Sequence, residues 1–490
     1  MSEPTPPIAI ERPARRRDLA PQAPVPDGFL DELRGACEVV TDDGARAEAG
    51  RDWWPLAMQW ALDGEVPGLP AAIARPTSTE EVAAVLRLCD ERRVPVTAAG
   101  GRSGVLGASV PVFGGIVLDT TAMAGITAVD ETAMTVEVLP GTFGDDFERE
   151  LATRDLTCGH WPQSVALSTV GGWLACRGAG QLSNRYGKIE DIVVGLEVVL
   201  ADGTVLRTGG VPRAADGPDL TRLFVGSEGT LGVITSATLR VHHRPLTTRE
   251  GAWGFATFDD ANDACRRILQ RGATPAVLRV YDSTEAARSY QTGELHVLLA
   301  YDEGDPRAVE GAWSVVEEEC AAADALDAAL VGRWFEHRNE VSALEALTRR
   351  GYVVDTMEVT GSWTDLPRIY DDTIAALRAV DGVQVASAHQ SHAYHDGACV
   401  YFTFAGKPEA DRRQAMYVEA WDAAQRAVLS AGGSLSHHHG VGLNRSRFAG
   451  EALGGGMAVL QSVKDALDPH GILNPGKLGL GSPFGEVRFP

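Results

Sequence analysis

Ala98-Ala-Gly-Gly-Arg-Ser-Gly-Val-Leu-Gly107 is the stretch of this 490-residue chain that decides its fold. Gly100, Gly101 and Gly104 permit unusual backbone angles and the close approach of a ligand. Successive backbone N–H groups in such a turn form a nest for an anion, and a pyrophosphate is a natural occupant. The loop follows neither the Rossmann nor the Walker pattern. It therefore predicts a phosphate site without naming the cofactor, although glycine-rich turns without a ligand are also common.

The residues around this loop predict an α/β region. Thr77, followed three residues later by Glu80, is typical of a helix capping box, and apolar residues then recur at helical spacing. A short strand over residues 94–98 leads into the glycine-rich loop. Farther on, apolar runs on both sides of an Asp-Gly pair predict a hairpin over residues 192–206.

Two further segments mix glycines with hydroxyl side chains. The first runs from Gly159-His-Trp-Pro-Gln-Ser164 to Ser168-Thr-Val-Gly-Gly-Trp173, and the second is Gly226-Ser-Glu-Gly-Thr-Leu-Gly-Val-Ile-Thr235. Each alone is equally compatible with a tight turn between strands. Three such segments within one α/β region favour a site for a large planar or phosphorylated cofactor.

The pattern of predicted helices and strands divides the chain into four parts. We expect a leader and helical segment over residues 1–70, of which 1–27 are predicted to be disordered. The cofactor-binding domain follows over 71–245. Helices then alternate with strands, which predicts a second α/β domain with a mostly antiparallel sheet over 246–440. Residues 441–490 form a closing segment with one helix over 457–467.

Bulk composition excludes several classes of protein. The net charge of −23 argues against a nucleic-acid partner over the whole surface, although a local basic pocket remains compatible with it. Seven scattered cysteines without a C-x-x-C pair indicate reduced thiols and a cytoplasmic protein. The sequence shows neither a signal peptide nor 18 uninterrupted apolar residues. We expect a homodimer that acts on a small-molecule or lipid substrate, and peripheral membrane contact is left open.

Three consecutive histidines, His437, His438 and His439, hold a quarter of the 12 histidines in the chain. If the segment is extended, His437 and His439 point to one side and His438 to the other. Adjacent imidazolium ions would repel, so at least one ring should be neutral near pH 7. Such a group is suited to proton transfer.

Together these segments resemble the vanillyl-alcohol oxidase superfamily, and most closely the alkylglycerone-phosphate synthase family within it. The resemblance rests on the three glycine-containing segments, on Tyr394-His-Asp-Gly-Ala-Cys-Val-Tyr-Phe402 and on Gly432-Gly-Ser-Leu-Ser-His-His-His-Gly-Val-Gly442. It extends over roughly residues 50–480, and the closing Asn474-Pro-Gly-Lys477 is similar to that of other FAD-linked oxidases in the superfamily.

The resemblance implies an α+β fold, with a two-subdomain FAD-binding domain of the vanillyl-alcohol oxidase (p-cresol methylhydroxylase) type and an α/β cap domain. Many members of the superfamily attach FAD through a histidine in a G-G-H-S sequence, and here that position is Arg102. FAD should therefore be bound non-covalently. The residues expected to hold it are Ala98, Gly100, Gly101, Arg102, Ser103, Gly104, Ser164, Ser168, Thr169, Gly171, Gly172, Arg177, Glu228, Gly229, Gly232 and Ile234.

The synthase family implies a redox-neutral exchange of an acyl for an alkyl group in ether-lipid synthesis, through an adduct at flavin N5. The residues that match its catalytic positions are Tyr394, His437, His438, His439 and Arg338, and Arg279 is expected to bind substrate. His389 stands where the family has a second arginine. Because imidazole is shorter and only partly charged, it is a poorer phosphate ligand, and non-phosphorylated substrates become plausible.

The main alternative is an FAD-dependent 2-hydroxyacid dehydrogenase of the glycolate or D-lactate type. That branch resembles the same scaffold, often with a divalent metal, but His438 occupies the position of its glutamate. His392, His438 and His439 are conceivable ligands, yet a contiguous run aims its rings poorly at one ion, so no metal is predicted. Tyr394 and the histidine run argue against a flavin-binding protein without catalysis, and the glycine-containing segments argue against a pure lipid-binding module.

Overall fold

Two sheets form the N-terminal half of the computed structural model, which describes residues 6–10, 13–340 and 342–489. The first sheet has the order β2-β4-β6-β5, with β2 antiparallel to β4 and the other pairs parallel. Its strands are β2 Glu38–Val40, β4 Ala72–Arg75, β5 Val96–Ala99 and β6 Ile116–Asp119, and the nearby helices are α1 Phe29–Arg34, α2 Asp43–Ala49, α3 Pro55–Ala61 and α4 Thr79–Arg92. The glycine-rich loop begins directly after β5.

The second sheet is antiparallel and has the order β11-β10-β12-β8-β7. Its strands are β7 Ile126–Asp130, β8 Thr135–Val138, β10 Val193–Val199, β11 Val205–Gly209 and β12 Val233–Arg240; the accompanying helices are α5 Gly144–Ala152, α6 Val170–Cys176, α7 Ser183–Tyr186, α8 Ile189–Ile192 and α9 Leu220–Phe224; and β9 Leu156–Thr157 pairs with β13 His242–His243. The β10–β11 pair is the predicted hairpin.

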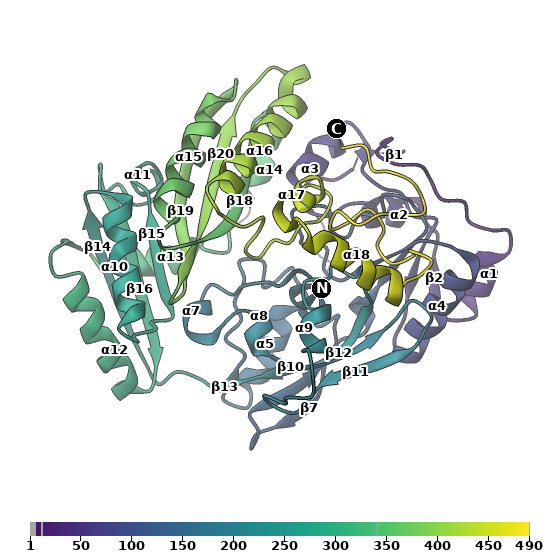
Figure 1. Ribbon diagram of the computed structural model, residues 1–490, viewed down its shortest axis with the longest axis horizontal. Coiled ribbons are helices and arrows are strands. Elements are labelled where there is room, and N and C mark those ends of the chain that lie inside the picture. Colours follow the sequence, from purple (N-terminus) through teal and green to yellow (C-terminus); the bar gives the residue numbers. More distant parts are fainter. Residues whose placement is uncertain (1–5, 11–12, 341, 490) are drawn as a thin grey trace.

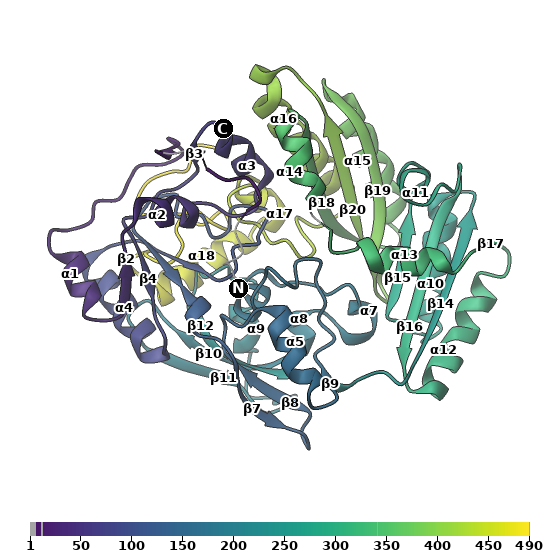
Figure 2. The same ribbon diagram turned by 180° about the vertical axis from the view of Figure 1, so that it is seen from behind.

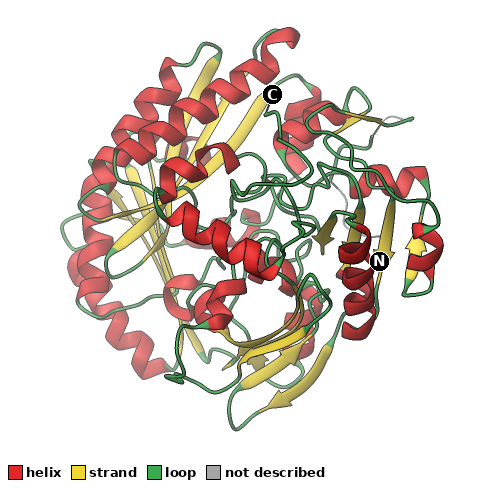
Figure 3. Cartoon of the chain, turned by 45° about the vertical axis from the view of Figure 1, so that its right-hand side comes forward, coloured by secondary structure: helices red, strands yellow, loops and turns green. Residues whose placement is uncertain are grey.

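The cap domain is one antiparallel seven-stranded sheet with the order β17-β14-β16-β15-β19-β20-β18. Its strands are β14 Thr247–Phe255, β15 Val277–Tyr281, β16 His296–Gly304, β17 Asp324–Leu326, β18 Val353–Ser362, β19 Val383–Ala393 and β20 Gly397–Gly406, and its helices are α10 Phe258–Gln270, α11 Ser283–Tyr290, α12 Pro306–Glu319, α13 Ala329–His337, α14 Ser342–Arg349, α15 Leu366–Ala379 and α16 Arg413–Ser430. Figure 1 shows α10, α12, α15 and α16 along one face of this sheet, and Figure 3 shows helices along the outer side of the molecule. The predicted antiparallel cap is confirmed.

Strand alternation decides which side chains of the cap face the N-terminal domain. On β15, Leu278 and Val280 pack into the core shared with the outer helices. Val277 and Tyr281 pack on the opposite face, in a cluster that includes residues of α11, α13 and the N-terminal domain. Because side chains alternate along a strand, Arg279 lies on this inner face. Figure 2 shows α11, α13 and α14 on the same side.

The prediction of a disordered leader is wrong for the described residues before position 28. β1 Arg15–Arg16 pairs with β3 Glu65–Val66, and the side chains of Ile8 and Leu19 are buried. Residues 1–5 and 11–12, which the same prediction included, lie outside the described residues. Apolar residues scattered among prolines and arginines give no periodic signal, which is why the sequence suggested disorder.

The capping prediction for α4 was wrong by one residue. Ser78 is the N-cap, and its side chain accepts the backbone N–H of Glu81. Glu81 in turn accepts hydrogen bonds from the backbone and hydroxyl of Thr77. At the other end of the chain, α17 Ala449–Leu453 and α18 Gly456–Leu467 return to the N-terminal domain, where Lys464 Nζ donates to the carbonyl of Thr230.

Candidate functional site

A cavity of about 550 Å³ lies between the loops of the N-terminal domain and the inner face of the cap sheet. All of the residues predicted to hold the cofactor line it except Arg177. Arg177 ends α6 in a left-handed conformation and pairs with Glu190 instead. The predicted loops, distant in sequence, are thus brought to one site.

The 98–107 loop presents unused hydrogen-bond donors to this cavity. Arg102 has a left-handed φ of 52°, and no backbone N–H of residues 101–104 donates to another protein atom within the described chain. The side-chain Nε of Arg102 and the indole Nε1 of Trp53 are also buried without a partner. A concave run of free N–H donors beside a cation fits the pyrophosphate of FAD. Trp53 was not among the predicted contacts.

Glu228, one of the predicted cofactor residues, has its carboxylate engaged elsewhere. It accepts the backbone N–H groups of Val441 and Gly442 at 2.5 and 2.9 Å. A Cβ at Gly440, where φ is 82°, would lie 2.3 Å from this carboxylate. Glu228 therefore ties the loop after the histidine run to the wall of the cofactor cavity, and glycine is required for this approach.

The histidine run is not extended; it bends around the buried carboxylate of Glu358. The backbone N–H groups of His437, His438 and His439 donate to Glu358 Oε1 at 3.1, 3.0 and 2.8 Å. Arg445, which is also fully buried, donates to Glu358 Oε2 at 2.8 Å. Burial alone would raise the pKa of Glu358, but Arg445 and His439 hold it well below its ordinary value. Glu358 is therefore an anion that fixes the loop.

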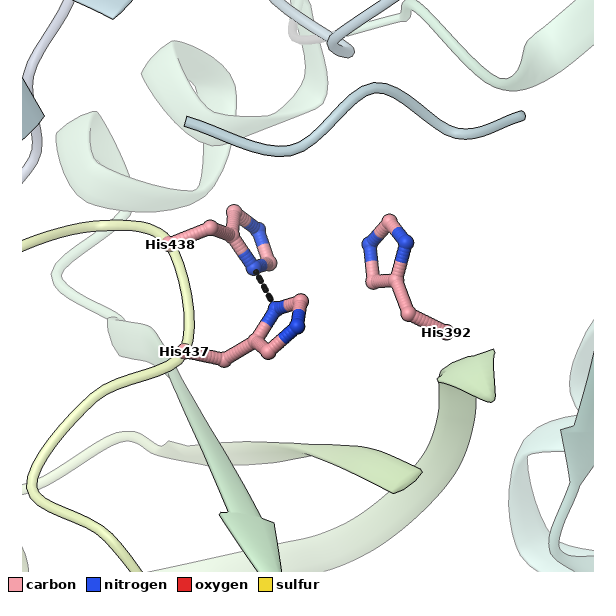
Figure 4. A group of neighbouring side chains, drawn as sticks. All are labelled: His392, His437 and His438. Atoms are coloured by element: carbon pink, nitrogen blue, oxygen red, sulfur yellow. Dashed lines mark hydrogen bonds between the residues drawn. The ribbon is translucent and has the colours of Figure 1, made fainter. Parts of the chain in front are cut away.

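This bend overturns the predicted separation of the rings. His437 Nδ1 lies 2.8 Å from His438 Nδ1, so these two imidazoles meet instead of pointing apart. His437 Nε2 lies 2.7 Å from the hydroxyl of Tyr394. Figure 4 shows the two rings meeting, with His392 beside them at the end of β19. The side chains form one hydrogen-bonded chain from His438 through His437 to Tyr394.

Only part of this hydrogen-bonded chain of side chains faces the cavity. His392, His438 and His439 line it, whereas His437 and Tyr394 do not. The half-buried Tyr394 is thus placed behind the cavity wall, and it reaches the cavity through two imidazoles. A register shift between Gln390 and His392 in β19 interrupts strand alternation there, so the face to which these side chains point could not be assigned from the sequence.

Burial keeps the imidazoles of His392, His437 and His438 neutral. Desolvation lowers the pKa of His392, His437 and His438 well below the ordinary value of 6.5. Neutral imidazoles have one accepting nitrogen each and can take up a proton. Burial also raises the pKa of the Tyr394 hydroxyl, so it remains a proton donor until its neighbour accepts.

One nitrogen from each of His392, His437 and His438 lies within 4.8 Å of the others. This grouping differs from the one considered from the sequence, which included His439 in place of His437. A metal ion bound there would replace the hydrogen bond between His437 and His438.

The substrate-binding candidates lie on the cap side of the cavity. Arg279 and Arg338 both line it, and within the described chain neither pairs with a carboxylate. Arg279 donates to the hydroxyl of Tyr281 at 3.1 Å, and Arg338 donates to the side-chain oxygen of Gln181 at 2.9 Å. Two guanidinium groups without a carboxylate partner favour an anionic ligand.

His389 also lines the cavity, but it is paired with an acid. Its Nδ1 lies 3.0 Å from Glu285 Oε1. Burial lowers the pKa of His389, so we assign a neutral ring that donates to an ionised Glu285. The contacts with His389 and Arg288 lower the pKa of Glu285 despite its burial.

The sequence reasoning missed several residues of this site. Glu358 lies in an apolar strand between Met357 and Val359, and a single acid in such a run was the available signal. Arg445 and Glu285 carry no local pattern that marks them. Tyr401 lies within the matched segment, lines the cavity and has its hydroxyl 3.3 Å from His439 Nε2.

Comparison with known proteins agrees with this geometry. Residues 70–209 match the FAD binding domain family, and residues 244–478 match the family of the C-terminal domain of FAD linked oxidases. An uncharacterised FAD-linked oxidoreductase of Escherichia coli strain K12, YgcU, is 31% identical over 480 residues, which cover 92% of this chain and 97% of that protein. The chain therefore belongs to the FAD-linked oxidase family, and FAD is its cofactor.

Two other relatives are named for two different activities. An alkyldihydroxyacetonephosphate synthase of Dictyostelium discoideum is 31% identical over 459 residues, which cover 85% of this chain and 74% of that protein. The glycolate oxidase subunit GlcD of Bacillus subtilis strain 168 is 30% identical over 448 residues, which cover 88% and 93%. Both are related to this chain at nearly the same identity, so the family is shared and the reaction is not decided by it.

Solved structures show the same fold. An alkyldihydroxyacetonephosphate synthase superposes with a TM-score of 0.79 at 27% identity, over 96% of this chain and 89% of that one. A p-cresol methylhydroxylase superposes with a TM-score of 0.74 at 17% identity, over 94% and 99%. The predicted α+β fold with its two-subdomain FAD-binding domain is confirmed. Within the part of the chain that the structure describes, helices long and apolar enough to span a bilayer are absent.

Proposed function

We propose that this enzyme moves a proton from a substrate in the cavity along His438, His437 and Tyr394 in a reaction that uses FAD. FAD, when bound, supplies the ring that accepts or returns the electrons of the substrate. The observation that carries the proposal is the continuous contact from His438 Nδ1 to His437 and from His437 Nε2 to the Tyr394 hydroxyl, at 2.8 and 2.7 Å.

The hydrogen-bonded chain of His438, His437 and Tyr394 is suited to move a proton away from the cavity. His438 lines the cavity, and its Nε2 has no hydrogen-bond partner within the described residues. A proton taken up there passes from His438 Nδ1 to His437 Nδ1, and His437 Nε2 then passes its proton to the Tyr394 oxygen while the half-buried hydroxyl releases its own proton to solvent. Each step shortens or lengthens a bond that is already formed, so no ring has to turn. Arg279 and Arg338 would hold the anionic group of the substrate.

The first candidate for the overall reaction is exchange of an acyl for an alkyl group. Its support is the match of Tyr394 and the histidine run to the synthase family, together with the synthase relative at 31% identity. In this reaction a proton that leaves the substrate returns to it later, so the chain would store the proton between two steps.

A specific observation favours a second candidate, net oxidation of a 2-hydroxy acid. Arg279 and Arg338 in the cap wall suit a carboxylate, and none of the described cap residues that line the cavity has an aliphatic side chain to hold a fatty chain. The relative named glycolate oxidase subunit adds to this support. Here the proton leaves through Tyr394 and does not return.

Anaerobic absorption spectra of the holoenzyme distinguish the candidates. Bleaching of the flavin by a hydroxy acid, with reoxidation by a dye, supports oxidation. Formation of an ether from an acyl dihydroxyacetone phosphate and an alcohol, without net bleaching, supports exchange. Tyr394→Phe should slow either reaction about 100-fold or more. Tyr352→Phe is the matched control, because Tyr352 lies outside the cavity beside Lys407. Equal rates in both variants would refute the proton chain.

We also propose that the protein is a cytoplasmic homodimer. All seven cysteines are free thiols, which supports a reducing compartment. Analytical ultracentrifugation of the holoenzyme tests the dimer, and a single species at the mass of one chain would contradict it.

A further inference from the structure

The cap contributes a polar wall to the cavity. Its lining residues there are arginine, histidine, tyrosine, serine, glutamate and tryptophan. No described lining residue between positions 246 and 440 is aliphatic. An alkyl chain placed against this wall would desolvate the charged groups of Arg279, Arg338 and Glu285, and its apolar contacts there would be limited to aromatic rings such as that of Trp334. The wall therefore suits a ligand that offers hydrogen bonds along its length.

Glu285 adds a fixed negative charge to this wall. It is 7% exposed and lies in the first turn of α11, where the helix dipole favours an anion. His389 at 3.0 Å and Arg288 at 3.8 Å hold its carboxylate in place. Of the ion pair between Glu285 and Arg288, only Glu285 lines the cavity.

The wall thus combines two kinds of recognition. The guanidinium groups of Arg279 and Arg338 attract an anion, whereas Glu285 accepts hydrogen bonds and repels additional negative charge. A phosphate monoester carries a charge of about −1.5 to −2 at pH 7, and a carboxylate carries −1. A hydroxyl can donate to Glu285, but a methylene cannot. A ligand with one carboxylate and several hydroxyls satisfies all three groups.

Building on the proposed function, we propose that the substrate is a compact polyhydroxylated carboxylic acid and that Glu285 is the residue that selects it. The selection works in two directions. Glu285 disfavours a phosphate ester through charge, and it favours a hydroxylated acid over an alkyl acid because a ligand hydroxyl adds a hydrogen bond to those that its carboxylate already accepts from His389 and Ser387. Of the two overall reactions, this substrate class fits oxidation, because such an acid carries a hydroxyl to oxidise and no acyl ester to exchange.

Three six-carbon probes separate these effects: gluconate, hexanoate and sorbitol 6-phosphate. Their dissociation constants are measured from the change in flavin absorption of the anaerobic holoenzyme. Gluconate should bind at least about tenfold more tightly than either of the others, which corresponds to about 1.4 kcal/mol. Hexanoate or sorbitol 6-phosphate binding as tightly as gluconate would overturn the proposal. This comparison uses the unaltered protein and does not depend on any variant folding.

Glu285→Gln then tests the assigned residue. The ratio of the sorbitol 6-phosphate dissociation constant to the gluconate dissociation constant should fall about tenfold, because the amide keeps the hydrogen bond to a hydroxyl and loses the repulsion. Glu303→Gln is the matched control: Glu303 is a buried acid of the cap that accepts from Tyr186 and Tyr301 and does not line the cavity. Its ratio should stay at the wild-type value, and melting temperature and FAD content confirm that both variants fold. An unchanged ratio in folded Glu285→Gln refutes the role of Glu285.

The two proposals fail separately. If a phosphate ester alone binds and reacts with the flavin, and Tyr394→Phe abolishes that reaction, the proposed function stands and this inference fails. If gluconate binds with the expected preference but Tyr394→Phe reacts with every substrate as fast as the wild type, the proton chain fails and the binding inference stands.

Discussion

Glu358→Gln is the substitution that most directly separates positioning from chemistry in this site. The carboxylate of Glu358 is fully buried and accepts three consecutive backbone N–H groups of the histidine run on one oxygen. Its other oxygen accepts from Arg445 at 2.8 Å. A glutamine has one accepting oxygen, so its amide N–H₂ must face either the backbone donors or the guanidinium. In both orientations donors meet donors, and Arg445 loses its buried counter-ion.

The expected cost follows from that loss. Removing one member of a buried ion pair destabilises a protein by about 3–5 kcal/mol, because the remaining charge is left without compensation. We therefore expect the free energy of unfolding, measured by urea titration of the holoenzyme, to fall by about 3–5 kcal/mol. A change below about 0.5 kcal/mol, the level of an ordinary surface substitution, would refute the assignment of Glu358 as an ionised anchor.

A second variant shows whether Glu358 also positions the imidazoles. Glu358→Gln combined with Arg445→Met removes the uncompensated cation and should recover much of the lost stability. The three backbone N–H groups still lack their shared carboxylate, so flavin reduction should remain slow. Recovery of both stability and rate in the double variant would mean that Glu358 serves stability alone.

The other predictions concern the cofactor, the proton chain and the response to acid. Heating or acid should release FAD into the supernatant, and Arg102→Ala should raise its dissociation constant about 10- to 100-fold by removing a charge-assisted donor; flavin that remains with the precipitate would contradict non-covalent binding. His437→Asn should slow flavin reduction as much as Tyr394→Phe does, and the double variant should be no slower than either, because both interrupt one chain; additive losses would separate the two residues. Burial lowers the pKa of His160 from 6.5 to about 3. Below pH 6.5 the unfolded state therefore binds a proton that the folded state does not bind, and the free energy of unfolding falls as the pH drops. His160→Phe should reduce this slope by about 1.4 kcal/mol per pH unit between about pH 6 and about pH 4.5 in unfolding titrations, and an unchanged slope would show that His160 is protonated in the fold.

The cofactor half of the site could be predicted from the sequence because its determinants are local. The turn over residues 98–107 depends on its own glycines, and φ angles such as that of Arg102 are set within a few residues. Hydroxyl and glycine spacing likewise encodes the later loops. Each loop was therefore recognised by itself, and the parallel and antiparallel sheets that carry them bring the three together.

The orientation of the histidine run could not be predicted, because its determinants are distant. Glu358 lies 79 residues before His437, and Arg445 reaches it from the other side of the run. A carboxylate shared by three backbone N–H groups replaces the extended conformation that an isolated segment would favour. The same limit applies to Tyr394, whose placement depends on a register shift in β19.

The backbone and the side chains of the histidine run have different roles: the backbone holds the loop, and the rings of His437 and His438 carry the proton. The backbone N–H groups are bound to an anion, Glu358, whereas burial keeps the rings of His437 and His438 neutral. The ring of His439 also contacts the anchor, with its Nδ1 3.1 Å from Glu358 Oε2, whereas the rings of His437 and His438 contact each other. Because Glu358 holds His437 and His438 through their main chain, these two rings remain free to take up a proton. Substituting either ring should therefore leave the loop in place and stop proton transfer, whereas substituting Glu358 should leave every ring present and disturb all three together.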